Sequence, residues 1–228
     1  MKLTPHMWQI FTVRQVPRVF WSASTPYVLR PSLLTLIITI LGLCIFGAGE
    51  ALMIGAHFGV SPWTVLAQGL SVQCSISVGV ATFIVSILVL LLWIPLAQKP
   101  GWGTFLNALV VAVMIEWMTP IVSFAHESLS LVLLQVVLGV LLVGIGSGVY
   151  LVGNLGAGPR DGLMTGCQRV TNLPIALVRS FIELSAVICG MALGGIVGWG
   201  TLIFALGVGP TVSMGLYAMQ RFSVKDMQ

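Results

Sequence analysis

The chain has 228 residues, of which 57% are hydrophobic and only 7% are charged, and its mean hydropathy is +1.06. So few polar residues cannot cover a water-soluble fold of this size, which excludes a soluble globular protein and indicates an integral membrane protein. The formal net charge of +4 comes from cations of the kind that anchor a chain at a membrane surface, and it argues against a nucleic-acid partner.

The first segment, residues 1–31, mixes cations with aromatic residues. Arg14 and Arg18 interrupt the stretch that could otherwise serve as the apolar core of a signal peptide, so we expect no cleaved signal. Trp21 and Tyr27 lie among these cations, a mixture typical of chain at the level of the lipid headgroups. We therefore predict a cytoplasmic, interfacial segment that contacts membrane lipids.

Six apolar runs follow, and each has roughly the 20 residues that a helix needs to cross the hydrocarbon core. They predict an all-α membrane protein with six transmembrane helices. A competing model adds a further span to each half of the chain, residues 60–76 in the first half, but this stretch carries Ser or Gln at five positions, so we reject it as a span. The six predicted spans are 32–56, 78–97, 104–124, 129–153, 174–193 and 201–219.

The sequence repeats itself at an offset of 97 residues. The block Gly-Trp-Gly-Thr at 101–104 returns at 198–201, and Pro62 returns as Pro159. Low-complexity apolar sequence does not place such blocks at one fixed offset, so we infer a duplicated unit. An odd number of spans in each copy makes the copies enter the membrane from opposite faces, which predicts two inverted three-helix repeats, an arrangement common among transporters and channels.

The cations set the predicted orientation. The repeats comprise residues 32–124 and 129–220, and a cytoplasmic N-terminus then places Lys99, Arg160 and Arg169 inside the cell, as the positive-inside rule requires. The tail 221–228 is also expected to be cytoplasmic.

A short helix is predicted after the first span of each repeat, over residues 61–74 and 158–170. Each begins with an N-cap residue followed by proline in the first helical position. Breaks at matching positions of two repeats mark solute sites in transporters, although two capped interfacial connectors are an open alternative. The external break comprises Gly59, Ser61 and Pro62, and the cytoplasmic break or gate comprises Gly158, Pro159, Arg160 and Asp161.

Three ionisable residues within the predicted spans indicate a substrate or ion pathway, because charges are costly in a membrane. Glu50 has no basic neighbour in its own span, so it is a candidate to carry a proton or hold a cation. Arg179 and Glu183 are one helical turn apart and can form an ion pair. A pair that only fixes helix packing is the alternative interpretation of these two.

The remaining reactive residues show no pattern of a catalytic or metal site. The four cysteines form no Cys-x-x-Cys pair, and the three histidines are scattered. We predict no enzymatic activity, no metal and no cofactor.

Several motifs together resemble a known family. These are residues 59–63 (Gly-Val-Ser-Pro-Trp), residues 156–162 (Gly-Ala-Gly-Pro-Arg-Asp-Gly), the Arg179 and Glu183 pair, and the block at 198–201. They are similar to the YczE branch of the YczE/YyaS/YitT family of bacterial integral membrane proteins. The resemblance implies a multi-pass protein of the bacterial cytoplasmic (inner) membrane, and it supports the fold and the location more than an activity.

The function that these features indicate best is transport of an unknown small solute or ion by alternating access between the repeats. A passive channel would use the same repeats without a coupled carboxylate. A membrane scaffold, or a regulator of another pathway, would need no solute path at all. The sequence is compatible with a homo-oligomer.

Overall fold

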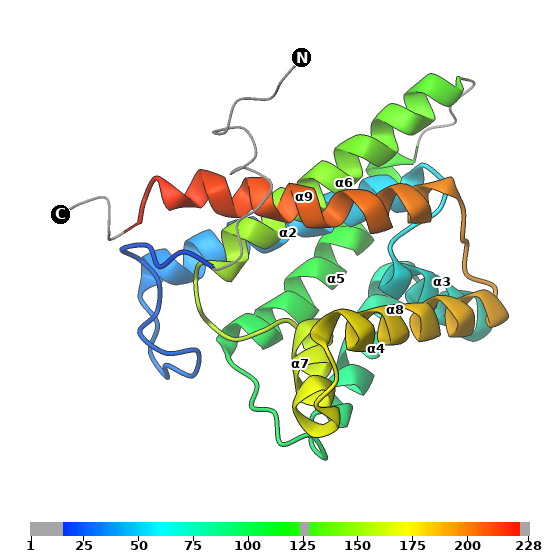
Figure 1. Cartoon of the computed structure of the whole chain (residues 1–228). Coiled ribbons are helices and arrows are strands. Elements are labelled where there is room, and N and C mark those ends of the chain that lie inside the picture. The colour runs from blue at the N-terminus through cyan, green and yellow to red at the C-terminus, as the bar shows by residue number, and fades with distance from the viewer. Residues whose placement is uncertain (1–15, 124–127, 224–228) are drawn as a thin grey trace.

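The computed structural model describes residues 16–123 and 128–223, which form an all-helical fold without strands in these ranges (Figure 1). The predictions for residues 1–15, 124–127 and 224–228 concern segments outside the described part of the chain. The helices are α2 (Leu33–Gly55), α3 (Pro62–Cys74), α4 (Val78–Leu92), α5 (Trp102–Val122), α6 (Leu129–Leu151), α7 (Pro159–Thr171), α8 (Ile175–Ala192) and α9 (Trp199–Gln220).

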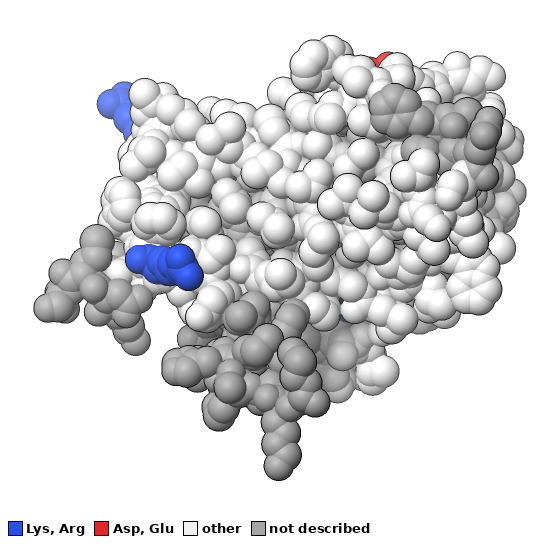
Figure 2. Space-filling model, turned by 90° about the horizontal axis from the view of Figure 1, so that it is seen from above, with Lys and Arg blue, Asp and Glu red and all other residues white. Residues whose placement is uncertain are grey.

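Five of these helices, α2, α5, α6, α8 and α9, are long and apolar enough to cross a membrane. A sixth span results if α3 and α4, which meet at a bend of 112°, are counted as one broken span. Figure 2 shows a broad uncharged face with a few charged side chains only at its margins, as expected for a surface that meets lipid.

The predicted span over 78–97 is longer than the helix that forms. α4 has 15 residues and ends at Leu92, and the chain from 93 to 97 runs in turns. Pro95 disfavours helix in the residue before it. Trp93 is buried against Gly162, and its indole Nε1–H donates to the Pro159 carbonyl oxygen at 2.9 Å. The end of α4 is therefore fixed against α7 and does not continue as a straight helix.

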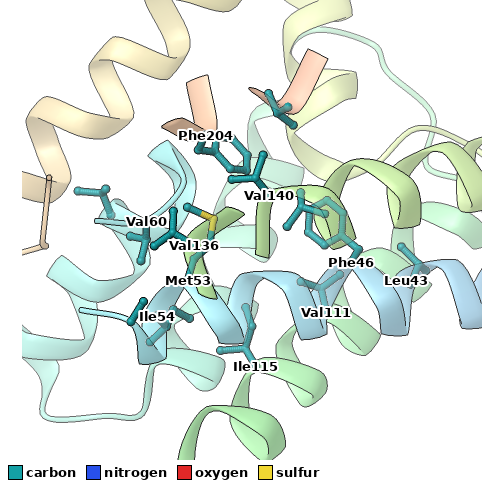
Figure 3. Close-up of a cluster of buried hydrophobic side chains, with 14 of the residues drawn as sticks. Leu43, Phe46, Met53, Ile54, Val60, Val111, Ile115, Val136, Val140 and Phe204 are labelled. Carbon is teal, nitrogen blue, oxygen red and sulfur yellow. The ribbon is translucent and has the colours of Figure 1, made fainter. Parts of the chain in front are cut away.

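The centre of the fold is the crossing of α2 and α6, with α5 and α9 packed beside it. A methyl group added to Gly146 would lie 2.5 Å from the Phe46 nitrogen and 2.6 Å from the Gly42 carbonyl oxygen. Only glycine allows the backbones to approach so closely, as is common where membrane helices cross. Around this crossing, Figure 3 shows Leu43, Phe46, Met53, Ile54, Val60, Val111, Ile115, Val136, Val140 and Phe204 as one buried cluster.

The loops that precede α3 and α7 are tied to helices of the opposite half of the chain. The Gly200 N–H donates to the Phe58 carbonyl oxygen at 2.8 Å, and the Gly103 N–H donates to the Leu155 carbonyl oxygen at 2.7 Å. Gly59, which follows Phe58, has φ +112°, a conformation that residues with a side chain rarely adopt. Each break is therefore a fixed turn that starts a short helix.

The described part of the N-terminal segment packs against the ends of α6 and α9. Trp21 is buried and belongs to a small cluster with Val152 and Leu216. The Ala23 N–H donates to the Gly153 carbonyl oxygen at 3.0 Å. These contacts make residues 16–31 an integral part of this end of the bundle.

Candidate functional site

A cavity of about 60 Å³ lies where the first turns of α3 and α7 meet α2, α4 and α5. It contains both charged groups and apolar walls. Its lining comprises Phe46, Glu50, Ser61, Trp63, Thr64, Thr82, Val85, Ser86, Val89, Asn107, Val111, Ile115, Pro159 and Arg160.

Glu50 is the most deeply buried charged residue of this cavity, with only 2% of its surface exposed. Its Oε2 accepts a hydrogen bond from Ser61 Oγ at 2.9 Å and another from Thr64 Oγ1 at 2.8 Å. Ser61 is the N-cap of α3, and Thr64 lies in its first turn, so the positive end of the α3 dipole also points at this carboxyl group. Glu50 Oε1 accepts no hydrogen bond from any described residue.

Arg160 brings a positive charge to the same cavity. It is the second residue of α7, and its guanidinium carbon lies 5.0 Å from the centre of the Phe46 ring. Phe46 and Glu50 are one turn apart on α2, so the cation and the carboxyl group share one face of that helix. Within residues 16–123 and 128–223 the Arg160 guanidinium forms no hydrogen bond and no ion pair shorter than 4 Å, although it interacts electrostatically with Asp161 and, less strongly, with Glu50.

Arg160, which we assigned to the cytoplasmic break, lies in the first turn of α7 and stacks on Phe46 at the cavity. It reaches this place because α7 begins at the break and directs its first turn toward α2. Two other cations of the predicted cytoplasmic side, Lys99 in the α4–α5 connection and Arg169 in the last turn of α7, line one shared hollow.

The two predicted breaks are not separate in space. Ser61 of the break called external and Pro159 and Arg160 of the break called cytoplasmic line the same cavity. Pro62 is buried at the first position of α3, and Gly59 packs on the start of α9. The first turns of the two short helices therefore converge on one site.

Gly158 and Asp161, the other two residues of the predicted cytoplasmic break, do not line the cavity. Gly158 is the N-cap of α7. Asp161 lies in the first turn, and its Oδ2 accepts a hydrogen bond from the Tyr150 hydroxyl of α6 at 3.0 Å. Asp161 does not line the cavity, so its contacts fit a carboxylate that stabilises a helix N-terminus.

Arg179 and Glu183 form the predicted ion pair, with Arg179 Nε 3.0 Å from Glu183 Oε1. Their side chains are 52% and 26% exposed, and neither lines the cavity. Thr82 and Ser86 occupy the equivalent positions of α4, 97 residues earlier, and these two do line it. Periodicity placed the pair on one helix face, but it could not say whether that face points inward.

Sequence reasoning missed five polar residues of the site, namely Trp63, Thr64, Thr82, Ser86 and Asn107. The indole nitrogen of Trp63 is buried without a hydrogen-bond partner in the described structure, and the Asn107 amide likewise forms no hydrogen bond there. One signal was available: Trp63 and Arg160 are equivalent in the repeat, so the second residue of both short helices reaches the cavity.

The described residues contain no group of three or more His, Cys, Asp or Glu side chains that could hold a metal ion. The polar residues that line the cavity offer hydrogen bonds and charged groups.

Comparison with known proteins identifies the family. A model described as "Family of unknown function (DUF6198)" matches residues 33–216, and this match includes every residue that lines the cavity. The chain belongs to the DUF6198 family. An uncharacterized protein of Haemophilus influenzae is 39% identical over 210 residues, which cover 92% of this chain and 94% of the relative.

The predicted resemblance to YczE-type proteins is confirmed. The "Uncharacterized membrane protein YczE" of Bacillus subtilis is 32% identical over 168 residues, which cover 72% of this chain and 77% of YczE. The "Uncharacterized protein YyaS" of the same organism is 25% identical over 166 residues. No solved structure matches the chain. Similarity to a membrane protein, together with five or six apolar helices of spanning length, makes this DUF6198 member a multi-pass membrane protein.

Proposed function

We propose that the protein moves a small solute or ion across the membrane by alternating access. The observation that carries this proposal is the cavity itself, in which the buried Glu50 and Arg160 meet at the first turns of two helices without forming an ion pair within 4 Å. Ionisable groups without a close partner are costly in a membrane protein. Binding of a solute between Glu50 and Arg160 would explain why the protein has them in this cavity. The proposal includes no catalytic reaction, and the partners are membrane lipids and the solute.

We further propose that the two halves are inverted repeats. Gly49 packs against the Gly139 carbonyl oxygen as Gly146 packs against the Gly42 carbonyl oxygen. At the offset of 97 residues, Gly42 is equivalent to Gly139 and Gly49 is equivalent to Gly146. A two-fold rotation that exchanges the repeats therefore turns one contact into the other, and it places α2 and α6 antiparallel. The paired hydrogen bonds from Gly103 and Gly200 follow the same rule. Such symmetry lets one half rock against the other around a central site.

The proposed location is the bacterial inner membrane, with both termini in the cytoplasm. We expect a cysteine at Lys99 or Arg169 to resist a membrane-impermeant thiol reagent in intact cells, and a cysteine at Ser128, at the start of α6, to react. The four native cysteines are first replaced in every variant, and permeabilised cells supply the control. Labelling of Lys99→Cys together with protection of Ser128→Cys in intact cells would reverse the proposed orientation.

Reconstitution into liposomes tests transport. A panel of small solutes is first screened for stabilisation of the purified protein against heat, because a ligand stabilises the state that it binds. Liposomes preloaded with a stabilising solute should then accumulate the labelled solute by counterflow. An alternating-access protein gives this exchange, whereas a channel gives flux without counterflow and a scaffold gives neither. The Arg160→Gln variant should lose the exchange, and the Arg179→Gln variant, which lies outside the cavity, should keep most of it.

A further inference from the structure

The groups around the cavity that lack protein partners have a definite chemistry. The Arg160 guanidinium forms no ion pair within 4 Å with a described residue, although Asp161 attracts it from a longer distance. Asn107, on α5, adds an amide without a hydrogen bond, and the indole N–H of Trp63 is a buried donor without an acceptor. Buried polar groups are normally satisfied, and the exceptions call for an explanation such as an absent ligand. On this side the cavity offers donors and positive charge, which suit a carboxylate group.

The opposite charge is also present and also incomplete. Glu50 has both of its hydrogen bonds on Oε2, so Oε1 stays free to accept from a ligand. Glu50 and Arg160 line one cavity, yet they do not approach within 4 Å of each other. A ligand that carries both charges would contact both groups at once. An anion alone would leave Glu50 without a charged ligand group, and a cation alone would leave Arg160 with only its longer-range interaction with Asp161 in a low-dielectric site.

The size and the walls of the cavity limit which solutes can bind there. One water-sized site needs about 10–15 Å³, so the volume of about 60 Å³ holds a molecule of about four to six non-hydrogen atoms. Most of the remaining wall is apolar, with Val85 and Val89 from α4 and Val111 and Ile115 from α5. Thr82 and Ser86 of α4 also line it, but their hydroxyl groups already donate to carbonyl oxygens of their own helix. The apolar wall leaves room for a hydrogen atom or a methyl group.

We propose that the transported solute is a small neutral amino acid of the size of glycine or alanine. Its carboxylate binds Arg160, and its ammonium group donates to Glu50 Oε1. This inference rests on the proposed transport function and names the substrate class of the same cavity.

Binding of single-charge analogues to the purified full-length protein tests the inference. Glycine and alanine are compared by calorimetry with acetate, which has only the carboxylate, and with methylammonium, which has only the cation. We expect glycine to bind at least about tenfold more tightly than either analogue. Acetate binding as tight as glycine binding would overturn the inference in favour of a simple anion site, and equally tight methylammonium binding would do so in favour of a cation site.

Two variants separate charge recognition from folding. Glu50→Gln should weaken glycine binding and strengthen acetate binding relative to glycine, because it removes the charge that repels acetate. Val85→Ala keeps both charges and enlarges the apolar wall, so it should shift the preference from glycine toward alanine and larger homologues. An unchanged order of affinities in both variants would refute the assignment.

The liposome experiment distinguishes this inference from the proposed function. Counterflow of another solute that requires Arg160, without any binding of glycine or alanine, would refute the amino-acid assignment and leave transport in place. Binding of glycine without counterflow would leave the assignment in place and refute transport by alternating access.

Discussion

A Glu50→Gln variant should fold normally and lose solute binding and flux by about 10–100-fold. The glutamine side chain keeps the shape of the acid, and its carbonyl oxygen can still accept the hydrogen bonds that Ser61 and Thr64 donate to Oε2. What disappears is the ionisable carboxyl group at the cavity, which a bound ammonium group would hold in its charged form. A hydrogen bond to a charged group contributes about 1.5–3 kcal/mol, and each 1.4 kcal/mol is about a tenfold change in affinity.

The measurement is a Kd from calorimetry and an initial rate of counterflow in liposomes, with the melting temperature in detergent as the test of folding. Glu116→Gln is the matched control, because Glu116 lies on an exposed part of α5 outside the cavity. It should bind and transport like the wild type. If Glu50→Gln keeps its full activity, including any dependence on pH, Glu50 has no coupling role, and a channel or a scaffold becomes the better interpretation.

The local parts of the fold could be predicted because their causes are local. The short helices predicted over 61–74 and 158–170 form over Pro62–Cys74 and Pro159–Thr171. Proline fixes its own φ angle and lacks an N–H, so it marks the first helical position independently of tertiary contacts. The apolar runs of about 20 residues likewise predicted α2, α5, α6, α8 and α9, because the thickness of a bilayer sets the length of a transmembrane helix.

The site needed contacts that sequence spacing does not contain. Arg160 and Glu50 are 110 residues apart, and only the convergence of α3 and α7 brings them to one cavity. From the sequence, Glu50 was expected to lack a partner, because its own helix contains no basic residue that could reach it. In the structure Ser61 and Thr64, at the start of the next helix, donate hydrogen bonds to it. The inward face of α4 and the outward face of α8 likewise depend on packing, which explains why Thr82 lines the site and Arg179 does not.

The crossing of α2 and α6 should be the part of the fold most sensitive to added volume. A methyl group at position 146 would lie 2.5 Å from the Phe46 nitrogen, and a methyl group at position 49 would lie 2.6 Å from the Gly139 carbonyl oxygen. These neighbours are backbone atoms of packed helices, so they cannot rotate away, and the two helices must separate. We expect Gly146→Ala and Gly49→Ala each to cost about 1–3 kcal/mol of stability, and leucine at either position to cost more.

Gly209→Ala is the control for these substitutions, because Gly209 lies within α9 and an added methyl group there meets no atom within 4 Å outside the neighbouring residues 208 and 210. Alanine favours helix over glycine by up to about 1 kcal/mol, but Pro210 disfavours helix in a preceding residue that has a side chain, so this variant should stay close to the wild type in stability. Unfolding in detergent, followed by circular dichroism, gives the comparison. If α2 and α6 cross by the proposed two-fold symmetry, the costs at positions 49 and 146 should be similar. A Gly146→Ala variant as stable as Gly209→Ala would show that the helices do not cross there.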